Sequence, residues 1–63
     1  MGLHSNRNFN MKGRDGREYN IDIDIKENGN VDFTVRDVVA RSIVDDGWFV
    51  ISKSGVLRIE RVK

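Results

Sequence analysis

Strict alternation of apolar and polar side chains over three segments is the feature that most constrains the fold of this chain. Residues 19–26 alternate without a break, and shorter alternations occupy residues 9–12 and 31–35. A period of two places every second side chain on the same face of an extended strand. We therefore predict three strands with one apolar face each. Because the chain has only 63 residues, we expect a flexible N-terminal arm (1–8) and a single domain (9–63).

Short segments that end in glycine follow or precede the predicted strands. They are residues 14–16, 27–29 and 53–55. A three-residue hairpin loop places its last residue in the left-handed conformation, which glycine adopts without a Cβ penalty. Since cross-strand partners share a face of the sheet, such loops fix which side chains lie opposite each other. The predicted pairs are Met11 with Tyr19, Ile25 with Val31, Ile23 with Phe33, Phe49 with Ile59 and Ile51 with Leu57.

Between the third and fourth predicted strands the spacing of apolar residues changes to i, i+3, i+4 and i+8, which is typical of an amphipathic helix. The positions that follow this spacing are Val35, Val38, Val39 and Ile43. Thr34 and Asp37 have the spacing of a capping box, and Gly47 follows as a candidate C-terminal cap. The expected fold class is α+β: a small two-layer domain with a β-meander of three strands, one helix and a C-terminal β-hairpin (βββαββ).

The helix is expected to pack on the apolar face of the sheet and to complete the core. A domain of about 60 residues buries only about 60% of the surface of its unfolded chain, so it is marginally stable without disulfides, metals or oligomerisation. Self-association or a tightly bound partner is therefore expected. The predicted core residues are Phe9, Met11, Tyr19, Ile21, Ile23, Ile25, Val31, Phe33, Val35, Val38, Val39, Ile43, Phe49, Ile51, Leu57 and Ile59.

Composition excludes several classes of function. The chain has no Cys, so it has no disulfide and no Cys-ligated zinc, and its single histidine, His4, falls in the expected arm. No spacing of Ser, His and carboxylates indicates a nucleophile with a positioned base. The longest apolar run is four residues, 48–51, which is too short for a membrane span. We expect a cytoplasmic protein without enzyme activity, cofactor, metal, small-molecule substrate or membrane contact.

Three acidic residues gather on the polar face of the predicted second hairpin. The register places Asp24 opposite Asp32, with Asp22 one step along the same face. Like charges directly opposite each other destabilise a sheet. Either these carboxylates are simply solvated, or they form an acidic patch for a positively charged partner, which would be a basic protein surface or a weakly held divalent ion.

The terminal hairpin carries apolar side chains on both of its faces. With Phe49 directed to the core, Trp48, Val50 and Val56 fall on the opposite face. Trp is the residue type most enriched at interface hot spots. We predict that these three residues contact a protein partner or a second copy of the chain in a homodimer.

Charge is segregated along the chain. Residues 1–17 contain four basic residues and one acid, residues 18–46 three basic residues and eight acids, and residues 47–63 four basic residues and one acid. The main hypothesis is a non-enzymatic protein-binding module, that is, an inhibitor, adaptor or regulator of a protein partner. The alternative is a DNA- or RNA-binding regulator that uses its basic ends, although its pI of 8.2 is below that of most nucleic-acid domains. The candidate phosphate contacts are Arg7, Arg14, Arg17, Arg58 and Arg61.

Overall fold

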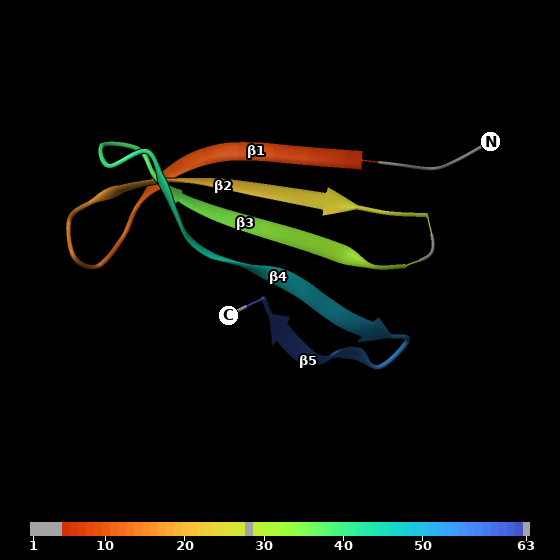
Figure 1. Cartoon of the computed structure of the whole chain (residues 1–63). Helices are drawn as coiled ribbons and strands as arrows, with labels where there is room; N and C mark the ends of the chain where they lie inside the picture. Colours follow the sequence, from red (N-terminus) through yellow and green to blue (C-terminus); the bar gives the residue numbers. More distant parts are fainter. Residues whose placement is uncertain (1–4, 28, 63) are drawn as a thin grey trace.

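Five antiparallel strands in sequence order form one sheet (Figure 1). The computed structural model describes residues 5–27 and 29–62. Each strand pairs with the next strand along the chain, so the topology is a simple meander. The strands are β1 (Ser5–Lys12), β2 (Glu18–Ile25), β3 (Val31–Asp37), β4 (Ser42–Ser52) and β5 (Gly55–Arg61). Within the expected N-terminal arm, residues 5–8 belong to β1, and residues 1–4, including His4, lie outside the described residues.

The register predicted for β1, β2 and β3 is confirmed. Ile25 lies opposite Val31, and Met11 lies opposite Tyr19. Gly16 has a φ of 80° and Gly29 a φ of 90°, so both loop glycines take the left-handed conformation expected at the ends of three-residue loops. Alternation and turn chemistry therefore determine this part of the sheet together.

The predicted helix is wrong, and the fold is all-β rather than α+β. The segment 38–41 makes a single helical turn, in which the Arg41 amide donates to the Asp37 carbonyl at 2.8 Å. Arg41 then takes a φ of 58°, a left-handed conformation that ends the turn. Val35 extends β3 and Ile43 belongs to β4 instead. The β-branched residues of this stripe have weak helix propensity and pair readily as strands.

The predicted core is also corrected, because no apolar side chain among the described residues is buried. Val39 is 87% exposed at the tip of the turn, and Val38 and Ile43 are exposed as well. Without the helix, the apolar face of the sheet has no second layer within the chain. The predicted two-layer arrangement is therefore replaced by a single layer.

The open shape of the molecule follows from this single layer. No strand contacts any strand other than its sequence neighbours. The radius of gyration of the Cα atoms is 13.0 Å, whereas a compact chain of this length would have about 10.6 Å. The described part of the chain contains no helix, and so none with the length and apolar character of a membrane span.

The last two strands are less regular than the first three. Register shifts interrupt the β3–β4 ladder at Val35 and the β4–β5 ladder at Val50. Phe49 lies opposite Ile59 as predicted, but Ile51 pairs with Val56 rather than with Leu57. The hairpin therefore turns over two residues, and an extra residue in β5 restores the register further along.

Gly47 lies within β4 and is not a helix cap. It is one of two residues in the described chain that are buried. A Cβ atom placed on Gly47 would lie 2.0 Å from the Glu60 carbonyl oxygen and 3.0 Å from the Arg61 Cα. The amide of Val62 donates to the Asp46 carbonyl at 3.0 Å. Glycine at position 47 thus allows β5 to approach the β4 backbone closely.

Candidate interaction surfaces

The apolar face of the sheet is the most extensive apolar surface of the described chain. Phe9 and Met11 on the edge strand β1 are 46% and 49% exposed, and Ile59 on β5 is 48% exposed. The side chains nearer the centre are half-buried by their neighbours, and the rings of Phe33 and Phe49 lie 5.1 Å apart. We call this surface the apolar face. Its residues are Phe9, Met11, Tyr19, Ile21, Ile23, Ile25, Val31, Phe33, Val35, Phe49, Ile51, Val56 and Ile59.

The edges of the apolar face carry a few charged side chains. Arg7 lies on β1 opposite Ile23, and Asp45 and Arg61 lie on the β4–β5 side. Arg61 Nε donates to Asp45 Oδ2 at 3.0 Å. Both groups are partly exposed, so the pair contributes at most about 1 kcal/mol to folding.

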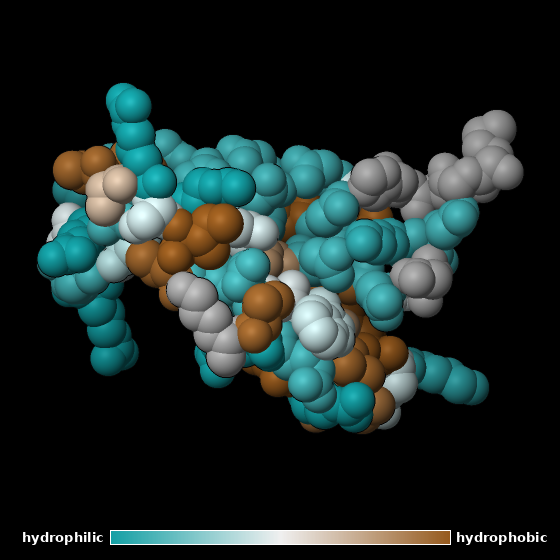
Figure 2. All heavy atoms as spheres, viewed as in Figure 1, coloured by the Kyte–Doolittle hydropathy of each residue, from teal (hydrophilic) through white to brown (hydrophobic). Residues whose placement is uncertain are grey.

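The opposite face of β1 and β2 is polar, and its amide side chains bond to each other across the two strands. Asn8 and Asn20 each donate to the other, at 3.1 and 2.8 Å, and Asn20 also donates to Asn10 at 2.8 Å. Asn10 in turn donates to Glu18 at 3.1 Å. Hydrophilic side chains cover β1 and β2 in Figure 2, whereas hydrophobic ones gather over β4 and β5. These amides stabilise the β1–β2 pairing through cross-strand hydrogen bonds.

The predicted acidic residues do lie together. Asp22, Asp24 and Asp32 line a shallow hollow of about 470 Å³ together with Asn6 and Thr34. Each of the three makes an interaction within the chain: Asn6 donates to Asp22 at 2.7 Å, Asp32 pairs with Lys26, and Asp24 is also engaged. No group of metal-ligating side chains occurs in the described chain.

Lys26 compensates part of the repulsion between Asp24 and Asp32. Its Nζ lies 2.9 Å from Asp32 Oδ2. The hydrogen bond to Asp32, with the charges of Asp32 and Asp24, raises the pKa of Lys26 above its usual value. The acidic pairing therefore has a local cation that stabilises it.

The three hairpin residues predicted as an interface do not share one face. Trp48 lies opposite Asp32 and Glu60, and Val50 lies opposite Arg58, so these two belong to the polar face. Val56 pairs with Ile51 near the end of the hairpin and is 59% exposed. Trp48 itself is 38% exposed.

The five arginines of the nucleic-acid alternative are spread over three parts of the molecule. Arg14 and Arg17 lie in or next to the β1–β2 loop, and Arg7 borders the apolar face. Arg58 lies on β5, where its Nε donates to Glu60 at 2.6 Å, and Arg61 is paired with Asp45. This distribution gives no continuous basic stripe.

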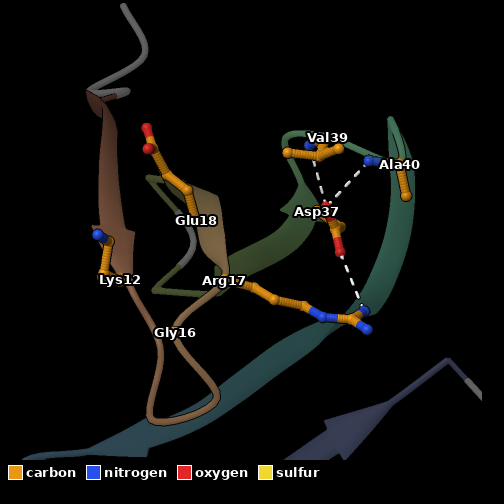
Figure 3. A pocket seen from close by; sticks show the side chains of 7 residues that line it. All are labelled: Lys12, Gly16, Arg17, Glu18, Asp37, Val39 and Ala40. Atoms are coloured by element: carbon orange, nitrogen blue, oxygen red, sulfur yellow. Dashed lines mark hydrogen bonds and ion pairs between the residues drawn. The ribbon is translucent and has the colours of Figure 1, made fainter.

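Sequence reasoning missed the β3–β4 turn at one end of the sheet, where Asp37 is the only buried polar residue of the described chain, at 4% exposed. Its Oδ1 accepts hydrogen bonds from the amides of Val39 and Ala40, both at 3.0 Å, and its Oδ2 lies 3.5 Å from Arg17 Nη1 (Figure 3). The amide of Val38 donates to the Glu18 carbonyl at 3.1 Å. Asp37 therefore caps the turn as it would cap a helix.

A hollow of about 590 Å³ lies beside this turn. One side is lined by Lys12, Gly16, Arg17 and Glu18, and the other by Asp37, Val39 and Ala40 (Figure 3). The hollow is thus lined by two cations and two acids. Comparisons of the chain with protein-family models, with curated proteins and with solved structures found no match.

Proposed function

We propose that this chain is a small non-enzymatic protein-binding module that works as a homodimer, with the apolar faces of two copies packed against each other. The observation that carries the proposal is the absence of any buried apolar side chain in the described part of the chain. A single-layer sheet with one apolar face gains most of its stability only when a second layer covers that face.

The size of the apolar face supports a second copy as the covering layer. Five strands about 4.8 Å apart and about 25 Å long outline roughly 500 Å² in projection. Side-chain relief brings the accessible area of such a face toward the roughly 800 Å² per partner of a stable interface. Two apolar sheets pack about 10 Å apart in a sandwich, and an identical sheet has the same length and character.

Charge also supports self-association. The whole chain has a formal net charge of only +1, so two copies repel each other weakly. The central residues of the apolar face are uncharged. Its edges carry both signs, in Arg7 and in the Asp45–Arg61 pair, and a two-fold axis would place these edges near one another. Such a dimer leaves both polar faces exposed for a further partner.

Sedimentation equilibrium tests the proposal. The wild type is expected to dimerise, and Phe9→Thr is expected to weaken dimerisation by at least about tenfold, because a two-fold interface loses the phenyl ring twice. Phe9 lies on an edge strand and is 46% exposed, so this change spares the monomer fold. Val62→Thr is the matched control, because Val62 is 64% exposed and lies two residues after Glu60, on the face that carries Trp48.

A wild type that remains monomeric at high micromolar concentration would contradict the homodimer. Equal weakening by Val62→Thr and Phe9→Thr would contradict the assignment of the interface to the apolar face. The alternative, nucleic-acid binding, requires a sub-micromolar complex with DNA or RNA whose affinity falls steeply with salt. We expect none, because the five arginines are dispersed and three of them are paired with acids.

A further inference from the structure

The turn between β3 and β4 presents an apolar tip at the end of the sheet. The tip consists of Val38, Val39 and Ala40, and Val39 is 87% exposed. The turn does not fold back onto the sheet, because Asp37 holds the amides of Val39 and Ala40 at 3.0 Å. Two valines are thus held in contact with water, at a cost that a soluble loop usually avoids.

Basic side chains surround the apolar tip. The β1–β2 loop, the end of β3 and the start of β4 meet at this end of the sheet (Figure 1). Long hydrophilic side chains project there around a small hydrophobic group (Figure 2). We call this region the basic end. Its basic residues are Lys12, Arg14, Arg17, Arg36 and Arg41.

The acids at the basic end are already engaged. Asp15 accepts hydrogen bonds from the Tyr19 hydroxyl and the Arg17 amide, and Glu18 accepts one from Asn10. Asp37 is buried beneath the turn. Among the described residues, Arg17 is the only one of the five cations in an ion pair, and its side chain is still 69% exposed. The basic end therefore presents a local excess of positive charge.

We propose that the basic end docks on an anionic phospholipid surface, with the apolar tip inserted between headgroups. Basic side chains are attracted to anionic headgroups, and an apolar side chain gains free energy when it enters the headgroup–acyl boundary. A nucleic acid would use the cations but would leave Val39 in water. The sequence predicts no membrane contact because it contains no spanning segment, and it assigns Val39 to the core through the predicted helix. Neither argument applies to an exposed turn that contacts only the membrane surface.

The hollow beside the tip suits this partner. Lys12 and Arg17 line it together with Val39 and Ala40, and so do the acids Glu18 and Asp37, which already accept hydrogen bonds within the chain (Figure 3). A phosphate group beside Lys12 and Arg17 would lie near cations while the tip contacts lipid. The proposal is independent of the homodimer, because the basic end lies outside the apolar face.

Vesicle flotation with phosphatidylcholine alone and with added phosphatidylserine tests the proposal. The wild type is expected to float only with vesicles that contain phosphatidylserine, and less at higher salt. Arg14→Gln with Arg41→Asn is expected to reduce partitioning by about thirtyfold, since each basic residue near an anionic surface contributes about fivefold. Asparagine tolerates the left-handed conformation of Arg41. Val39→Ser is expected to reduce partitioning to the vesicles as well, although this change leaves the charge of the basic end unaltered.

The matched control is Lys53→Gln with Arg58→Gln, which removes the same charge from the β4–β5 hairpin and should retain binding to within a few fold. Circular dichroism checks that each variant keeps its sheet. Three results would overturn the proposal: no flotation of the wild type, equal loss in the control, or full binding by Val39→Ser. So would tighter binding to a single-stranded oligonucleotide that Val39→Ser leaves unchanged, since it would indicate a nucleic-acid surface.

Discussion

The two halves of the sheet differ in how they are specified. In β1–β3, alternation over residues 9–12, 19–26 and 31–35 and left-handed glycines in both loops predict the cross-strand pairs between these segments. In β4 and β5, two register shifts and one close backbone approach decide the geometry. Alternation and turn glycines thus determine the regular strands of the meander, whereas the irregular strands depend on backbone contacts that the alternation does not encode.

The largest expected effect comes from the close approach in the second half. Gly47→Ala places a Cβ against the Glu60 carbonyl oxygen, and β5 must move away from β4. We expect the free energy of unfolding to fall by about 3 kcal/mol and the Val62 amide to exchange faster with solvent. Urea denaturation and hydrogen exchange measure the two quantities.

The matched change in the first half is Gly16→Ala. A Cβ at Gly16 has nothing within 4 Å, and only its φ of 80° opposes the substitution. We expect a loss of about 1 kcal/mol. If Gly16→Ala cost as much as Gly47→Ala, the close approach at Gly47 would not be the limiting feature of the second half.

The turn that joins the two halves gives a smaller effect. Asp37→Ala removes the acceptor for the amides of Val39 and Ala40, and the loss of such a cap costs about 1 kcal/mol. Asp37→Asn keeps an oxygen acceptor but loses the charge that faces Arg17, so it should cost less. Denaturation midpoints of the two variants check the order. Equal costs of the two variants would assign the role of Asp37 to its ion pair with Arg17, which both variants lose.

The sequence predicts the strand pairing of the first half of the sheet better than that of the second half. Ile23 opposite Phe33 and Asp24 opposite Asp32 follow from alternation and loop length alone. The helix fails because Val38 and Ile43 match a helical spacing as well as a strand–turn–strand arrangement, and tertiary pairing decides between them.

The candidate surfaces follow the same division. The proximity of Asp22, Asp24 and Asp32 was predictable, since it needs only the register of one hairpin. The separation of Val56 from Trp48 was not, because it results from an extra residue in β5. The exposure of Val39 depends on the cap at Asp37, whose spacing indicates the start of a helix but not that it stops after one turn.

Removing the cation beside the acidic pairing of the first half is expected to have a smaller effect on stability. Lys26→Gln leaves Asp24 and Asp32 facing each other without a cation, whereas Asp32→Asn removes the ion pair and the repulsion together. We expect Lys26→Gln to lower the free energy of unfolding by more than Asp32→Asn does. Thermal denaturation at low salt measures the difference, which should shrink as salt is added. Equal effects would show that Lys26 does not relieve the repulsion.

The smallest effect is a shift in titration within the first hairpin. The Tyr19 hydroxyl donates to Asp15, which raises the pKa of Tyr19 above its usual 10.0 and lowers that of Asp15 below 3.8. The contribution of Tyr19 to stability is therefore complete below pH 10.0 and is lost as the pH rises through its raised pKa. Since Tyr19 is the only tyrosine, phenolate absorbance reports it alone. Asp15→Asn should return the pKa toward 10.0, and an unchanged pKa would contradict the hydrogen bond.

The most direct test of the account is an isotope-filtered NOE experiment on a mixture of labelled and unlabelled chains, which detects contacts between copies only. We predict intermolecular NOEs from the Ile21 and Ile23 methyl groups to the Phe9 and Phe33 rings, and none to the Trp48 indole. Intermolecular NOEs at Trp48, or none at any of these side chains at concentrations well above micromolar, would contradict the claim that a second copy covers the apolar face.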